Sequence, residues 1–210
     1  MCLQVLRGRG GGAAVRLYML DSNTLTQADL ELVRWRFPAR YARACRMRRE
    51  EDRRSVIGSG VLLHRALGVE RESSLGCTPA GRPYLEQGPV FSLSHSGGRC
   101  LLAVGEGRRV GVDLERLDPD NLSAAPAALG PAELAWIREE PMKRFHILWT
   151  RKEALYKALG GYTDPKQIPA LEEELPPGLS IRSAIFEGFA LSLCADEKLS
   201  GLDPAIIKTI

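Results

Sequence analysis

Paired cysteines, long apolar runs and a large net charge are all missing from this sequence of 210 residues. The five cysteines are scattered and include no CxxC pair, which argues against a zinc knuckle and a disulfide framework. No run approaches the ~20 apolar residues that a membrane span requires, and residues 1–12 hold no apolar stretch of signal-peptide length. We therefore expect a reduced, cytoplasmic protein without a membrane segment.

Charge is nearly balanced over the whole chain but is unevenly distributed. The formal net charge is +3, and the 44% hydrophobic and 26% charged residues are ordinary for a globular protein rather than a disordered one. Nine arginines nevertheless fall between Arg34 and Arg54, against three acidic residues. A local basic block in a near-neutral protein indicates an anionic ligand rather than a general polycation surface.

Glycine and proline divide the chain into segments whose periodicity predicts both helices and strands. After a flexible leader over residues 1–14, Thr26 is a suitable N-cap for a helix that reaches Phe37. The other expected helices cover residues 40–49, 54–67, 131–139 and 142–159, and the expected strands cover residues 15–20, 90–94, 100–104, 109–115, 181–186 and 189–194. The fold class is therefore α+β, and we divide the chain into an N-terminal half, 15–105, and a C-terminal half, 106–210.

Residues 110–115 carry the first candidate site, because they alternate with a period of two. The valine and leucine side chains share one face of the expected strand, and Asp113 and Glu115 share the other. Adjacent carboxylates repel each other unless a cation lies between them, and oxygen ligands suit magnesium. Gly111 would also let a ligand approach the backbone. The alternative is a solvated strand face.

Residues 149–160 carry the second candidate, on a later helix. Glu153 and Lys157 are four residues apart and so occupy one helix face, with Trp149 one turn earlier. In the functional interpretation Glu153 is a metal ligand or general base, and Lys157 neutralises phosphate charge. The alternative is an ordinary surface ion pair worth a few tenths of a kcal/mol.

Two further patterns could bind an anion. Ser94 and His95 stand at a strand end before a Gly-Gly turn, where no acidic neighbour completes a Ser-His hydrolase triad, and His95 is equally compatible with a structural role. On a helical count Arg36, Arg40 and Arg43 share one face. That face could instead be solvated or bind nucleic acid, although aromatic residues are sparse there.

Taken in order, these motifs resemble the 4′-phosphopantetheinyl transferases of the surfactin-synthetase-activating type. The resemblance rests on residues 94–96, 111–115 and 149–157, with Gly81-Arg82-Pro83-Tyr84 upstream and the Arg-x-x-x-Gly pattern of residues 54–58. It runs from about residue 38 to 162. It implies a pseudo-dimer of two similar α/β halves, with the active site in the cleft between them.

The resemblance implies an enzyme that transfers phosphopantetheine from coenzyme A to a serine of an apo acyl or peptidyl carrier protein. Asp113, Glu115 and Glu153 would hold Mg²⁺, or Mn²⁺ in its place. Glu153 would also act as the base, and Lys157 would assist the leaving phosphate. The residues implied in coenzyme A binding are Arg40, Arg43, Arg54, Ser55, Arg82, Ser94, His95 and Lys157. The implied enzyme is monomeric and binds neither nucleic acid nor membrane.

One segment departs from the family pattern, and two other functions remain as alternatives to the transferase. Residues 121–129 are small and apolar, where the resemblance leads us to expect a basic and aromatic carrier-docking stretch. A non-catalytic module that binds coenzyme A or a nucleotide would keep the pocket but would not need Asp113, Glu115, Glu153 and Lys157 together. An RNA-binding protein would use the arginine block and would show strongly salt-dependent affinity.

Overall fold

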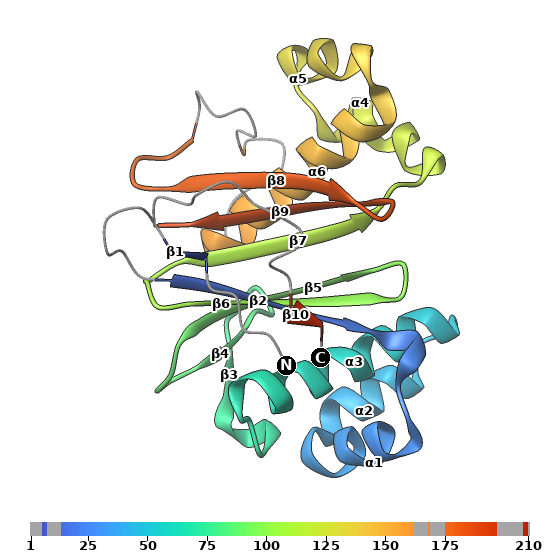
Figure 1. Ribbon diagram of the computed structural model, residues 1–210, viewed down its shortest axis with the longest axis vertical. Helices are drawn as coiled ribbons and strands as arrows, with labels where there is room; N and C mark the ends of the chain where they lie inside the picture. The colour runs from blue at the N-terminus through green and yellow to red at the C-terminus, as the bar shows by residue number, and fades with distance from the viewer. Residues whose placement is uncertain (1–5, 8–13, 162–167, 169–174, 197–207, 210) are drawn as a thin grey trace.

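The computed structural model describes residues 6–7, 14–161, 168, 175–196 and 208–209, which contain two main β-sheets (Figure 1). The first sheet has the order β1-β2-β6-β5, with β10 added beside β2, and the second has the order β7-β9-β8. Strands β3 and β4 form a separate antiparallel ribbon. The strand bounds are β1 Leu6–Arg7, β2 Ala14–Asp21, β3 Leu75–Cys77, β4 Pro83–Leu85, β5 Val90–Ser96, β6 Arg99–Gly105, β7 Val110–Arg116, β8 Ser180–Phe186, β9 Phe189–Ala195 and β10 Lys208–Thr209.

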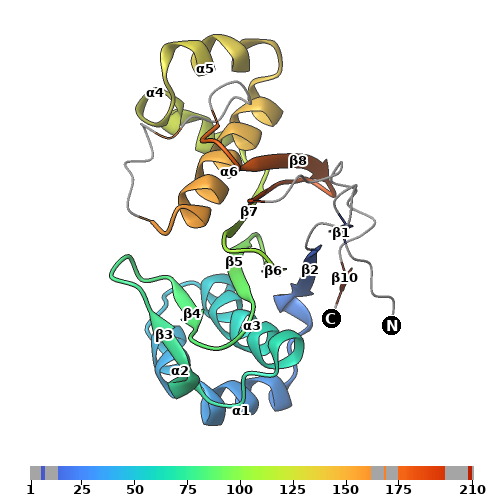
Figure 2. The same ribbon diagram turned by 90° about the vertical axis from the view of Figure 1, so that its left-hand side faces the viewer.

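Helices cover the outer faces of the two sheets. Figure 2 shows the sheets as neighbouring layers between two groups of helices, with β5 and β7 on the same side. The group beside the first sheet comprises α1 Gln27–Arg36, α2 Pro38–Cys45 and α3 Glu50–Leu67, with short 3-10 turns at Ser22–Thr24 and Glu72–Ser74. The group beside the second sheet comprises α4 Ala125–Ala128, α5 Pro131–Trp136 and α6 Pro141–Ala158, with 3-10 turns at Pro119–Ala124 and Ile137–Glu139.

Strand β6 is buried on both faces, which explains its continuous apolar sequence. Leu102 and Val104 pack against the helices of the first group. Leu101 and Ala103 point the other way, into a core shared with the second sheet. That shared core also takes residues from β2, β7 and β9, namely Val15, Leu17, Met19, Val110, Val112, Leu114, Phe189, Leu191, Leu193 and Ala195.

Most of the expected elements are confirmed, with their ends shifted at two prolines. Thr26 is the N-cap of α1 and forms a capping box with Asp29. The hairpin of β8 and β9 is confirmed, and both turn residues, Glu187 and Gly188, have positive φ. Pro38 and Pro141 begin α2 and α6, because a first helical residue needs no amide donor. In the described part of the chain no helix is both long and apolar enough to cross a bilayer.

The break before Pro38 corrects one expectation about the arginine block. Arg36 lies on α1 and forms an ion pair with Glu70, whereas Arg40 and Arg43 lie on α2. The three side chains therefore do not share one continuous helix face. The expected helix over residues 40–49 also ends earlier, at Cys45, and α3 begins at Glu50. The ribbon of β3 and β4 was not anticipated from the sequence.

Gly111 allows helix α6, rather than a ligand, to approach strand β7. A Cβ atom at this position would lie 1.9 Å from the carbonyl oxygen of Ala154 and 2.6 Å from the amide nitrogen of Ala158. Both are backbone atoms of α6, so neither can move aside alone. The interpretation of Gly111 as an opening for a ligand is therefore wrong.

We expect Gly111→Ala to lower the free energy of unfolding by at least about 2 kcal/mol, because the added methyl group would force α6 away from β7. For a chain of this size the loss corresponds to a fall in Tm of about 4 °C or more. Gly105→Ala is the matched control, because Gly105 is also a buried strand glycine. A Cβ atom added there would lie 3.4 Å from its nearest neighbours, which are side-chain atoms at an ordinary contact distance. Equal Tm values for the two variants would contradict this account.

Candidate functional site

The edge strands β5 and β7 run side by side and are joined through serine side chains. Three alternate serines of β5 accept hydrogen bonds from three alternate backbone amides of β7, and both residue numbers rise together, so the strands are parallel. The pairs are Val112 N to Ser92 Oγ at 3.1 Å, Leu114 N to Ser94 Oγ at 3.2 Å and Arg116 N to Ser96 Oγ at 3.1 Å. We call this set of contacts the serine junction.

Two of these serines also hold the carboxylates of β7. The hydroxyl of Ser94 donates to Asp113 Oδ1 at 2.7 Å, and the hydroxyl of Ser96 donates to Glu115 Oε2 at 2.7 Å. Asp113 is only 3% exposed, so the alternative of a solvated strand face is wrong for this residue. Its second oxygen, Oδ2, is buried and has no hydrogen-bond partner among the described residues. A buried carboxylate oxygen in this state is suited to binding a cation.

Helix α6 brings Lys157 and Glu153 to the same carboxylates. Lys157 Nζ lies 2.6 Å from Asp113 Oδ1 and 3.2 Å from the carbonyl oxygen of Val112. Its ion-pair partner is therefore Asp113, and not Glu153 as a simple surface pair would require. Burial raises the pKa of Glu153, the charge of Asp113 raises it further, and Lys157 opposes both effects.

Lys157 compensates only part of the negative charge of these carboxylates. Burial, followed by the charge of Asp113, raises the pKa of Glu115 to about 7, although the hydrogen bond from Ser96 acts in the opposite direction. Among the described residues, no three His, Cys, Asp or Glu side chains already surround a metal position. The donor set nevertheless fits Mg²⁺, which takes few protein carboxylates and completes its coordination with water and substrate phosphate oxygens.

A pocket of about 560 Å³ lies beside this cluster and is within the size range of small-molecule sites. Residues of α2, α3, the β3–β4 ribbon, β5 and the end of α6 line it. Lys157 belongs to both the pocket and the carboxylate cluster. The other positively charged side chains of the lining are Arg40, Arg43, Arg46 and Arg82. The pocket is therefore suited to an anionic ligand.

Arg40 and Arg82 contribute to the pocket in different ways. Arg40 donates to Ser59 Oγ at 2.7 Å, and its Nε is buried without a hydrogen-bond partner in the described structure. Burial lowers the pKa of Arg40, and Glu72 opposes this effect. Arg82 instead donates to three backbone carbonyl groups, those of Lys157, Phe91 and Val110. Arg82 thus fastens α6 to β5 and β7 at the pocket wall.

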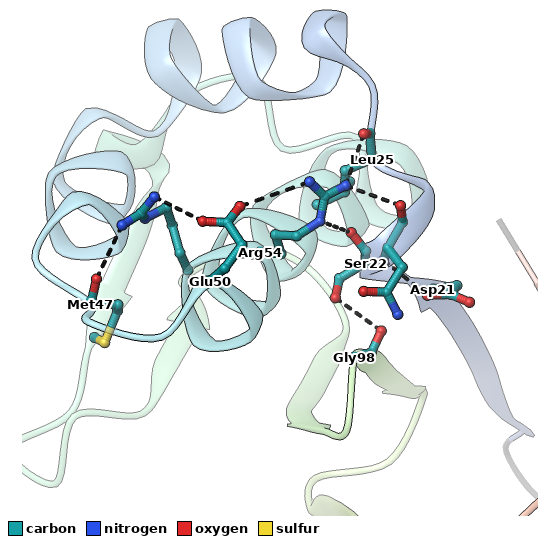
Figure 3. Close-up of polar contacts among 9 residues, drawn as sticks. Asp21, Ser22, Leu25, Met47, Glu50, Arg54 and Gly98 are labelled. Atoms are coloured by element: carbon teal, nitrogen blue, oxygen red, sulfur yellow. Dashed lines mark hydrogen bonds and ion pairs between the residues drawn. The ribbon is translucent and has the colours of Figure 1, made fainter.

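Arg54 and Ser55 do not line the pocket. Arg54 Nε donates to the carbonyl oxygen of Ser22 at 2.8 Å, and its Nη2 donates to two further carbonyl groups, at Asn23 and Leu25 (Figure 3). Ser55 is buried in α3, and its carbonyl oxygen accepts from the Cys100 thiol. The structure therefore gives Arg54 a role in fixing the turn after β2.

The remaining expected residues divide between the pocket and the serine junction. His95 lines the pocket, where partial desolvation together with Lys157 and Arg43 lowers its pKa. Ser94 faces Asp113 and is not part of the pocket lining.

Sequence reasoning did not single out Arg46, although it lies three residues after Arg43. It also did not anticipate that Ser92 and Ser96 would join two sheets.

Comparison with known proteins agrees with this geometry. A family profile described as the 4′-phosphopantetheinyl transferase superfamily matches residues 109–193, which include Asp113, Glu115, Glu153 and Lys157. The 4′-phosphopantetheinyl transferase AcpT of Salmonella typhimurium is 34% identical over 75% of this chain and 84% of its own length. The 4′-phosphopantetheinyl transferase HetI of a Nostoc species is 38% identical over 53% of each chain. A 4′-phosphopantetheinyl transferase of Bacillus subtilis is 26% identical over 53% of this chain and 54% of its own. With its carboxylates and lysine inside the matched region and its relatives aligned over most of its length, the chain belongs to the 4′-phosphopantetheinyl transferase superfamily.

Proposed function

We propose that this chain transfers 4′-phosphopantetheine from coenzyme A to a serine of an apo acyl or peptidyl carrier protein, and that it is of the surfactin-synthetase-activating type. The observation that carries the proposal is the contact between Lys157 and Asp113, which joins a basic pocket to a cluster of three carboxylates. A pocket alone would suffice for a non-catalytic coenzyme A binder. The names of the relatives also favour transfer over mere binding.

In the proposed reaction a bond forms between the carrier serine oxygen and the phosphorus of the phosphopantetheine group. The bond from that phosphorus to the bridging oxygen breaks, and adenosine 3′,5′-bisphosphate leaves with the electron pair. Glu153 takes the proton of the serine hydroxyl, directly or through water. Lys157 stabilises the charge that develops on the leaving phosphate.

Asp113, Glu115 and Glu153 would hold a magnesium ion, with manganese as an alternative. When bound, this ion would neutralise charge on the coenzyme A pyrophosphate. The unpaired Oδ2 of Asp113 and the raised pKa of Glu115 both support this assignment.

The pocket would receive the nucleotide end of coenzyme A. Arg40 and Arg43 would meet its phosphates, with Arg46 as an additional cation. His95 is neutral at pH 7 because its pKa is lowered, so it would act as a hydrogen-bonding group rather than as a charge. Arg82, Arg54 and Ser55 would support the site through the backbone and packing contacts described above.

We also propose that the chain is a monomeric pseudo-dimer divided near residue 105, with the pocket between its halves. The strand orders β2-β6-β5 and β7-β9-β8 support this division. In each half the chain forms first one strand, then a long helix and then a hairpin, and the second strand of the hairpin pairs with the first strand of the half. The helices α3 and α6, which occupy equivalent places, each contain 18 residues. The carrier itself, whether acyl or peptidyl, would be identified by assaying one of each in parallel.

We expect Glu153→Gln to lower the rate of phosphopantetheine transfer by about 10²- to 10⁴-fold, because the amide cannot accept the serine proton. The measurement is the mass gain of an apo carrier protein in the presence of coenzyme A and Mg²⁺. The Tm should stay close to wild type, and the exposed Glu86→Gln is the control. Wild-type activity of the Glu153→Gln variant would contradict the role of Glu153 as the base. If the wild-type chain produced no mass gain in any of several carrier proteins, the result would favour the non-catalytic module instead.

Stability without metal should fall as the pH rises from about 5 to 8. The folded-state pKa of Glu115 is about 7, above its ordinary value of 4.5, so the folded state binds the proton more tightly. Stability from this group is therefore present at low pH and is lost as the pH rises through 7, by about 2 kcal/mol.

Glu115→Gln isolates this effect, since His95 and other groups titrate in both proteins. Urea unfolding of the two proteins at pH 5 and pH 8 should show a steeper pH dependence in the wild type, and Mg²⁺ should raise wild-type stability most at pH 8. Parallel pH profiles of the two proteins would contradict the assignment to Glu115.

A further inference from the structure

With Asp113 and Glu115 ionised, the hydroxyl groups of Ser94 and Ser96 have one arrangement of hydrogen bonds. Each serine oxygen accepts an amide N–H from β7, and each hydroxyl has a single proton left to donate. An ionised carboxylate can only accept, so the protons of Ser94 and Ser96 must point to Asp113 and Glu115. The backbone of β7 therefore orients the same hydroxyls that hold its carboxylates.

This arrangement fixes one oxygen of each carboxylate and leaves the other available. Asp113 Oδ1 receives both Ser94 and Lys157, while Oδ2 is buried without a hydrogen-bond partner among the described residues. Glu115 Oε2 receives Ser96. A carboxylate held in this way cannot rotate without breaking a charge-assisted hydrogen bond, so the available oxygen keeps its direction.

The position of Ser96 is itself fixed by the turn that follows it. Gly98 has a φ of 78°, and its carbonyl oxygen accepts both the amide and the hydroxyl of Ser22, at 2.7 and 2.9 Å. Arg54 in turn binds the carbonyl oxygen of Ser22, as Figure 3 shows. Hydrogen bonds thus link α3 to this turn, and the backbone of the turn leads directly to Ser96, which holds Glu115.

We propose that Ser94 and Ser96 are positioning residues for the metal site, and that they select which oxygens of Asp113 and Glu115 are offered to a divalent cation. This inference rests on the metal role in the proposed function. Ser92 is the internal comparison, because its hydroxyl accepts the amide of Val112 in the same way, but the residue before that amide is Gly111, which has no carboxylate to hold. Ser92 also lines the pocket, so it serves as a control for metal binding only when coenzyme A is absent.

The test uses the full-length chain without coenzyme A or carrier and measures Mn²⁺ affinity by calorimetry. We expect Ser96→Ala to weaken Mn²⁺ binding by about tenfold, the usual effect of losing a partner of a metal-ligating side chain. Ser96→Thr, which keeps the hydroxyl, should restore affinity to within about threefold of wild type. Ser92→Ala should leave Mn²⁺ affinity within about twofold, even though it also loses one contact to β7.

Circular dichroism and Tm measured on each variant separate folding from metal binding. If Ser96→Ala failed to fold, Ser94→Ala would take its place against the same Ser92 control. Equal Mn²⁺ affinities for the Ser96→Ala and Ser92→Ala variants would overturn the proposal, as would a wild-type chain that does not bind Mn²⁺. Neither outcome depends on phosphopantetheine transfer, which the carrier mass assay tests separately.

Discussion

The serine junction is the contact on which the candidate site depends. The described structure shows no backbone hydrogen bond between β5 and β7, so the hydroxyls of Ser92, Ser94 and Ser96 satisfy the amides of β7 at this edge. The buried amides of Val112 and Leu114 require such partners, and each lost partner costs about 1–3 kcal/mol. Because two of these hydroxyls, those of Ser94 and Ser96, hold Asp113 and Glu115, the contact that joins the sheets also orients the carboxylates.

A second constraint is the close approach of α6 to β7. Gly111 has no side chain, so the backbone of α6 reaches β7 near Ala154 and Ala158. Lys157 and Glu153 lie on the same part of that helix, and Lys157 therefore reaches Asp113 at 2.6 Å. A bulkier residue at position 111 would shift both of these candidate side chains together. The absence of a Cβ atom at position 111 therefore accounts both for the close packing of α6 on β7 and for the contact between Lys157 and Asp113.

The sequence predicted the local structure of the site well, because periodicity and capping are properties of short segments. Such patterns predicted that Asp113 and Glu115 share one face of a strand, that Glu153 and Lys157 lie on a helix, and that Thr26 is an N-cap. It could not predict pairings between distant segments. Lys157 was matched to Glu153 by its spacing, whereas its partner Asp113 is 44 residues away. Arg54 likewise binds carbonyl groups that no periodic pattern reveals, at a turn about thirty residues earlier.

Charge balance links the two parts of the site. Three carboxylates and the single ammonium group of Lys157 leave the cluster with an excess of negative charge. Without a metal, Glu115 reduces that excess by binding a proton near pH 7. A divalent cation would remove the excess altogether, and Glu115 would then stay ionised at neutral pH. The pyrophosphate of coenzyme A brings further negative charge, which the arginines of the adjoining pocket can meet. Metal and nucleotide should therefore bind more tightly together than separately, since each supplies the charge that the other lacks.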